Sequence, residues 1–187
     1  MSTPLSIGEL CTRCASLAWL SARLFELIGG WAPQASDDRL VGAFAGQARR
    51  HGWHAELFTD QLPDSPSLAA STQPAPPGGG SGGWQAALAA ATELARSDVQ
   101  RALVVHDVLV PALVAELSRL DDIVAGSSDR DAGRPVARVV RIVLDDVIDD
   151  WRALGLIRPG LLALAADPTS DLGVAASVQV SLVAPPS

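Results

Sequence analysis

The chain contains no lysine, tyrosine or asparagine among its 187 residues, so all 14 of its cationic side chains are arginines. We read no function into this bias, because alanine, glycine, proline and arginine are abundant together, as in proteins from GC-rich genomes. The formal net charge is −7, and an acidic chain lacks the basic surface that nucleic-acid binding needs. Arg49 and Arg50 form a local basic pair that is too small to reverse this balance. We therefore expect no nucleic-acid partner.

Long hydrophobic runs are also missing. No stretch approaches the roughly 20 apolar residues needed to span a bilayer, and no N-terminal segment has the charged-then-apolar layout of a secretion signal. We therefore expect no membrane partner and a cytoplasmic location. Only two cysteines, Cys11 and Cys14, are present, and a reducing compartment would keep them as thiols. Their spacing within one predicted helical turn suits metal binding, redox chemistry or packing, but fits a disulfide poorly.

Two amphipathic segments open the chain. Apolar or small residues recur every three or four positions over residues 5–28 and again over residues 37–58, which predicts two helices. Ser6 and Glu9 form a capping-box pattern at the start of the first helix. The connection between the helices is short, so they should be antiparallel neighbours.

The middle of the chain separates two pairs of helices. Residues 63–83 are dominated by Pro, Gly, Ser and Ala, which predicts a mobile crossover linker long enough to run from one end of a bundle to the other. A third helix is expected over residues 84–124, with a kink or break at Pro111, and a fourth over residues 134–155. Neither pair could bury its apolar stripe alone, so we expect one domain over residues 1–155.

The rest of the chain, residues 156–187, is rich in Ala, Val and Leu and broken by several prolines. We expect this C-terminal tail to pack on the bundle or to be disordered. A short helix is expected at residues 160–166. Residues 174–183 alternate in polarity and could form a strand.

The predicted connectivity is helix, helix, long crossover, helix, helix, as in ferritin-like bundles. In that superfamily, helices two and four each carry a Glu-x-x-His motif, and the other two helices each supply a Glu. The segment HGWH from His51 to His54 falls where helix two carries its motif, and DVID from Asp146 to Asp149 falls at the corresponding level of helix four. The chain thus resembles the ferritin-like di-iron carboxylate superfamily over about residues 5–155. The resemblance implies an all-α fold, a ferritin-like antiparallel four-helix bundle with a long crossover between helices 2 and 3 and an irregular C-terminal tail.

The resemblance also implies a degenerate metal site. Only His54 keeps its family residue, because His51 and Asp146 replace Glu residues and Asp149 replaces a His. The comparable level of helix three offers His106, and helix one offers no carboxylate there. If His51, His54, His106 and Asp146 converge, they could hold one metal ion such as iron. The alternative for His106, which lies on the apolar stripe, is a core histidine with a satisfied hydrogen bond.

The cysteines offer a second arrangement. Cys11 and Cys14 are expected at about the level of His51 and His54 in an antiparallel hairpin. Together these four side chains would form a Cys₂His₂ set suited to tetrahedral zinc. The alternative is that two small buried thiols fill a tight layer between helices.

Four carboxylates gather within six residues of the fourth helix. We expect the inner members of this group to pair with Arg49 or Arg50, so that arginine charge replaces metal charge and stabilises an inactive site. The alternative is a solvated acidic face. The carboxylates are Asp145, Asp146, Asp149 and Asp150.

Two functions follow from these patterns. The first is a non-catalytic, structural or interaction role without a cofactor, as a homodimer or with another protein partner. The second is a metal-dependent oxidase or hydroxylase that uses non-haem iron, zinc or another divalent metal at a His-rich site in the bundle core.

Overall fold

A computed structural model describes residues 6–78, 83–126 and 130–183. Helices dominate these ranges, and no strand occurs within them. The expectation of an all-α fold is confirmed, and the possible strand at residues 174–183 is wrong, because that stretch is helical. Among the residues that the model describes, no helix is long and apolar enough to cross a membrane.

The first two helices form a hairpin. Helix α1 spans Ile7–Trp31 and begins with the expected capping box, in which Ser6 and Glu9 bond to each other's backbone N–H groups. A 3₁₀ turn, Ala32–Gln34, leads to α2, Asp38–Thr59. Small residues let the two helices approach closely: a Cβ built on Gly29 would lie 3.4 Å from the Cβ of Ala48. The two predicted helices therefore exist, and they pack against each other along their lengths.

The predicted third helix is two separate segments. Helix α3, Trp84–Leu94, ends near Ala95, and α4, Asp98–Leu103, starts after a second capping box at Ser97. A π-helical turn, Val104–Leu109, then joins α4 to α5, Val110–Ala125. The expected break at Pro111 is thus displaced, because the chain turns at residues 95–97 and widens before the proline instead of kinking at it.

Proline chemistry explains the π-helical turn. Pro111 has no N–H, and its ring would clash with the carbonyl of Asp107, four residues earlier, in a regular α-helix. The N–H of Val110 instead bonds to the carbonyl of Val105, five residues earlier. The wider turn gives the ring room while α4 and α5 continue along one path. Such single turns are frequent at functional sites.

The last two helices differ from expectation in length. Helix α6 spans Arg130–Leu164 and includes Pro135 and Pro159, so it begins earlier and ends later than predicted. Its extension past Gly155 is anchored by Leu161, which is buried. Helix α7, Pro168–Val183, then packs against α3. Residues 168–183 are therefore helical and pack against the side of the molecule that α3 and α4 form.

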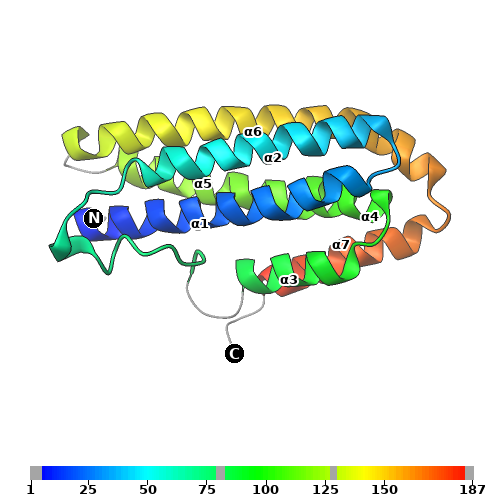
Figure 1. Cartoon of the computed structure of the whole chain (residues 1–187), viewed down its shortest axis with the longest axis horizontal. Helices are drawn as coiled ribbons and strands as arrows, with labels where there is room; N and C mark the ends of the chain where they lie inside the picture. Colours follow the sequence, from blue (N-terminus) through cyan, green and yellow to red (C-terminus); the bar gives the residue numbers. More distant parts are fainter. Residues whose placement is uncertain (1–5, 79–82, 127–129, 184–187) are drawn as a thin grey trace.

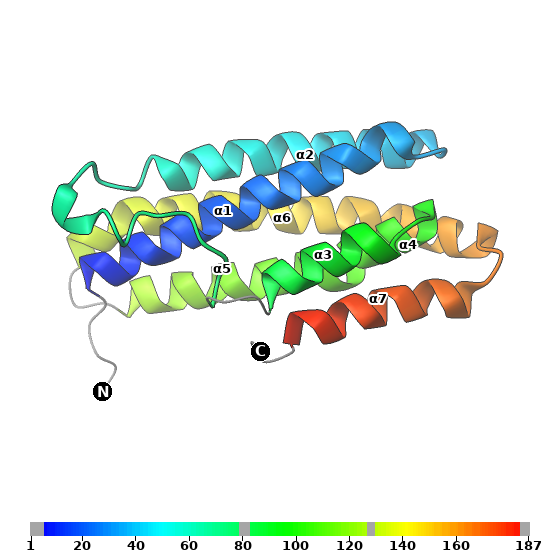
Figure 2. The same ribbon diagram turned by 60° about the horizontal axis from the view of Figure 1, so that its bottom comes forward.

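Four long segments run side by side and enclose the core (Figures 1 and 2). In Figure 1, α1 and α6 run from left to right, whereas α2 and the α4–α5 segment run from right to left. After α2, helix α3 carries the chain back along the outside of the molecule, beside α7, to the start of α4. Large, fully buried side chains line the interior: Leu20, Leu24, Ile28, Phe44, Phe58, Leu113, Leu117 and Leu154.

The Pro/Gly-rich segment follows a defined path as far as Gly78. It contains a 3₁₀ turn at Pro66–Leu68 and touches the start of α1, where a Cβ on Gly8 would lie 3.3 Å from the hydroxyl of Ser71. Residues 79–82 of the expected linker lie outside the described residues. The described part therefore lies against the helices.

Candidate functional site

His51 and His54 are both buried in α2, one turn apart, and their ring centroids are 5.7 Å apart. The Nε2 atom of His54 lies 3.0 Å from a carboxylate oxygen of Asp146 on α6. Because a carboxylate can only accept, this hydrogen bond places the proton of a neutral His54 on Nε2. The Nδ1 atoms of both histidines are buried and have no hydrogen-bond partner among the described residues.

The environment keeps these imidazoles neutral. Burial, together with the nearby charges of His54 and Arg50, lowers the pKa of His51 to about 3. Burial also lowers the pKa of His54, although the hydrogen bond and the charge of Asp146 act in the opposite direction. Neutral imidazoles can bind a metal ion or accept a proton.

Arg50, which directly precedes His51 and lies one turn before His54, forms an ion pair with Asp150. The Arg50 guanidinium donates two hydrogen bonds to the Asp150 carboxylate, from Nε to Oδ2 at 2.8 Å and from Nη2 to Oδ1. Asp150 is buried, whereas the Arg50 side chain is 37% exposed. The amide of Gln47 also reaches the Asp150 carbonyl at 3.4 Å. Arginine charge therefore offsets the one buried carboxylate of the DDVIDD segment.

The other members of the two charged groups face outward. Asp149 pairs with Arg152 at 3.1 Å on the surface, with both side chains more than 70% exposed. Arg49 and Asp145 are also exposed. They do not contribute charge to the interior around His54.

The cysteines lie at a different level from the histidines. A Cβ on Gly52 would touch the ring of Phe25 at 3.5 Å, so α1 meets the histidine segment near Phe25. Cys14 lies about three turns, roughly 16 Å, further toward the start of α1. The expected register was wrong because the 3₁₀ turn lengthens the connection between α1 and α2. Burial raises the pKa of Cys14 to about 12, helped by the nearby Cys11.

This register also places a carboxylate of α1, Glu26, near the level of the histidines, where none was expected. Glu26 lies close to the level of His51, but it is exposed and pairs with Arg23 at 2.6 Å. Helix α1 therefore carries a carboxylate at this level, but on its outer face and not toward the histidines.

His106 lies in a separate cluster on the π-helical turn. Its Nδ1 lies 2.5 Å from Oδ1 of Asp107. Arg158 of α6 holds the same carboxylate with two hydrogen bonds, at 3.0 Å and 2.7 Å. The indole N–H of Trp151 donates to the backbone carbonyl of His106 at 2.9 Å. The π-helical turn is thus tied to α6 by a network of side chains.

Gly155 makes room for this network. A Cβ at that position would lie 3.1 Å from Nε2 of His106, a separation that would force the ring to shift. Burial raises the pKa of Asp107, but hydrogen bonds from Arg158 and His106 outweigh it and leave the pKa below its usual value. Asp107 therefore stays ionised and orients the imidazole.

The structure does not gather the predicted ligands at one point. Within residues 6–78, 83–126 and 130–183, no group of three or more His, Cys, Asp or Glu side chains is arranged to hold a metal ion. The convergence of His106 with His51, His54 and Asp146 that a mononuclear metal site would need is therefore absent from the described residues. The π-helical turn directs His106 toward Gly155 and Trp151 of α6.

Sequence reasoning missed Arg158, Trp151 and Gly155 as members of the His106 cluster. The available signal was Pro111, which lies four residues after Asp107 and so disturbs the helix at that carbonyl. Comparisons of the chain with protein-family models, curated proteins and solved structures gave no match.

Proposed function

We propose that this chain is a ferritin-like bundle that acts by association and not by catalysis, with internal contacts in place of the family's metal site. The path of the chain supports the fold: a hairpin, a return along the molecule, and a second pair of long helices. With α2 parallel to α4–α5, this order has one long crossover, which is the ferritin-like arrangement. Helices α3 and α7 are additions to that plan.

The observation that carries the proposal is the Arg50–Asp150 ion pair beside the His54–Asp146 hydrogen bond. A di-iron centre needs several carboxylates to offset two buried cations. Here the one buried carboxylate of the DDVIDD segment, Asp150, already has a guanidinium partner, and the partly exposed Asp146 contacts a neutral imidazole. An arginine cation one turn from His54 would also repel a metal ion.

Metal analysis of the full chain tests this proposal. Protein purified without a chelator and exposed to Fe(II), Zn(II) or Mn(II) should retain much less than one equivalent after dialysis. Stoichiometric metal that is lost in a His54→Ala variant, but kept in an Arg152→Ala surface control, would overturn the proposal.

One observation favours the alternative, a metal-dependent oxidase or hydroxylase. The Nδ1 atoms of His51 and His54 are buried without partners among the described residues, and a carboxylate of Asp146 is adjacent. Retained metal in the experiment above would therefore support this alternative directly.

The outer face of α7 offers a surface for association as a homodimer. Ala175 and Val178 face the rest of the protein, whereas Leu172, Val180 and Val183 are 44%, 65% and 69% exposed. The exposed residues recur at helical spacing, so α7 has a second apolar face without a partner in this chain. A helix that is apolar on both sides is normally covered on both.

Charge also favours α7 as the contact between copies. The chain has a net charge of −7, so two copies repel each other over most of their surfaces. Helix α7 contains no arginine, and its one carboxylate, Asp171, is buried. Two α7 helices related by a twofold axis could therefore pack together without repulsion between like charges.

Sedimentation velocity over a range of concentrations tests this interface. The wild-type chain should sediment as a dimer, and Val180→Glu should give a monomer because the twofold axis brings two carboxylates together. Ile7→Glu, at a similarly exposed apolar residue (59%) on α1, is the control and should remain dimeric. A monomeric wild-type chain, or a Val180→Glu variant that stays dimeric, would contradict the α7 contact.

A further inference from the structure

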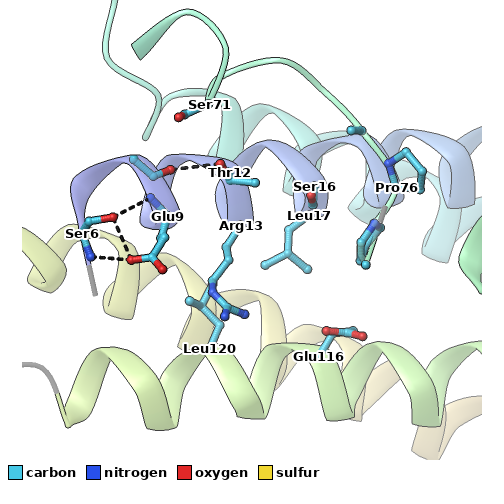
Figure 3. A pocket seen from close by; sticks show the side chains of 14 residues that line it. Ser6, Glu9, Thr12, Arg13, Ser16, Leu17, Ser71, Pro76, Glu116 and Leu120 are labelled. Carbon is cyan, nitrogen blue, oxygen red and sulfur yellow. Dashed lines mark hydrogen bonds between the residues drawn. The ribbon is translucent and has the colours of Figure 1, made fainter. Parts of the chain in front are cut away.

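A cleft lies between the first half of α1 and the second half of α5, closed on one side by the Pro-rich segment (Figure 3). Its volume is about 710 Å³, within the range of small-molecule sites. Leu17 and Leu120 form an apolar floor, and Pro76 lies on the opposite wall. The cleft is independent of both histidine clusters.

Arg13 is the distinctive polar group of this cleft. Figure 3 shows its side chain extending from α1 toward α5, with the guanidinium near Leu120. Arg13 makes no hydrogen bond or ion pair with any described residue, and its charge acts only at a distance on Glu9. An arginine over an apolar floor is suited to an anionic oxygen group, because its planar donors match a carboxylate.

The two carboxylates at the cleft are already engaged. Glu9 accepts hydrogen bonds from the backbone N–H and hydroxyl of Ser6, at 2.8 Å and 2.7 Å. Glu116 accepts one from Arg119 at 2.8 Å. Among the described residues, the exposed guanidinium of Arg13 is therefore the charged group at the cleft without a protein hydrogen-bond partner.

From this geometry we infer that the α1–α5 cleft binds a free single-chain amphiphile with an anionic head, such as a medium-chain carboxylate. The head lies against Arg13 and the chain lies on Leu17 and Leu120, under Pro76. Charge complementarity selects the sign of the head, and the apolar floor selects an alkyl chain instead of a small inorganic anion. This site goes beyond the association function and does not depend on it.

Isothermal titration of the full chain tests the site, with decanoate as the probe and decyltrimethylammonium as the probe of opposite charge. Decanoate should bind at one equivalent, more weakly as NaCl is raised. Arg13→Gln should weaken this binding about tenfold, which is the typical effect of losing one charged hydrogen bond. Arg23→Gln removes the same charge from α1 outside the cleft and should change the affinity less than about twofold.

A second variant tests the apolar part of the site. Ser16 lines the cleft and is only partly buried, so Ser16→Phe should fill the space and abolish decanoate binding. Circular dichroism verifies that this variant is folded, and the Arg13→Gln result stands without it. The inference is overturned if decanoate shows no saturable binding up to about 1 mM, if decyltrimethylammonium binds equally well, or if Arg13→Gln binds decanoate like the wild type.

Discussion

Breaking the Arg50–Asp150 pair should destabilise the protein by an amount that depends on which partner is removed. Asp150 is only 5% exposed, so Arg50→Ala leaves a buried carboxylate without its cation. Removing one partner of a fully buried pair costs about 3–5 kcal/mol. Because the Arg50 side chain is 37% exposed, water can partly replace it, and we expect about 2–3 kcal/mol.

The opposite change should cost less. Asp150→Ala leaves an arginine that can turn toward solvent, so we expect about 1–2 kcal/mol. The combined Arg50→Met, Asp150→Leu variant replaces both charges by apolar groups and should lie within about 1 kcal/mol of the wild type. A double-mutant cycle of Arg50→Ala, Asp150→Ala and the variant that carries both alanines isolates the energy of the pair.

Urea unfolding followed by circular dichroism at 222 nm measures these free energies. Arg152→Ala is the matched control, because the Arg152–Asp149 pair lies on the same helix with side chains 72% and 78% exposed. That surface pair should contribute no more than about 0.5 kcal/mol. If Arg50→Ala costs no more than this control, the reasoning that Asp150 needs a buried partner is refuted.

Three further predictions concern stability and reactivity. Gly42→Ala should raise the free energy of unfolding by about 0.5–1 kcal/mol, because an added Cβ meets no atom within 4 Å. Gly133→Ala should lower the free energy of unfolding, because its Cβ would lie 2.7 Å from the side chain of Val124. Urea unfolding of both variants separates the effect of helix propensity from the effect of packing. The pKa of His51 is about 3 in the folded protein and about 6.5 in the unfolded chain, so acid favours unfolding. The free energy of unfolding should therefore fall as the pH drops below about 6.5, by about 2 kcal/mol at pH 5. His51→Leu should remove most of this pH dependence. With its pKa raised to about 12, Cys14 should not react with a thiol reagent at pH 8 unless urea unfolds the chain.

The hairpin of α1 and α2 could be predicted from sequence because the signals are local. The apolar spacing and the Ser6–Glu9 capping box depend on residues a few positions apart. The level at which the two helices meet could not be predicted, because a 3₁₀ turn in the connection shifts every facing residue. That shift removed Cys14 from the level of the histidines.

The partners within the candidate site also depend on contacts between helices and not on local signals. The sequence offered two arginines and four aspartates as partners, and helical periodicity alone could not choose among them. The structure pairs Arg50 with Asp150 because these two side chains face each other across α2 and α6. The His106 cluster could not be predicted, since its members meet only when the widened turn and Gly155 bring α6 close.

The π-helical turn also sets how the two halves of one long segment are oriented. A turn closed from residue i to i+5 holds one more residue than an α-helical turn, so the sequence positions that face the core shift by one residue between α4 and α5. The segment therefore behaves as a helix carrying a one-residue insertion, and that extra residue is what places a histidine and a carboxylate against α6 within an otherwise apolar stretch.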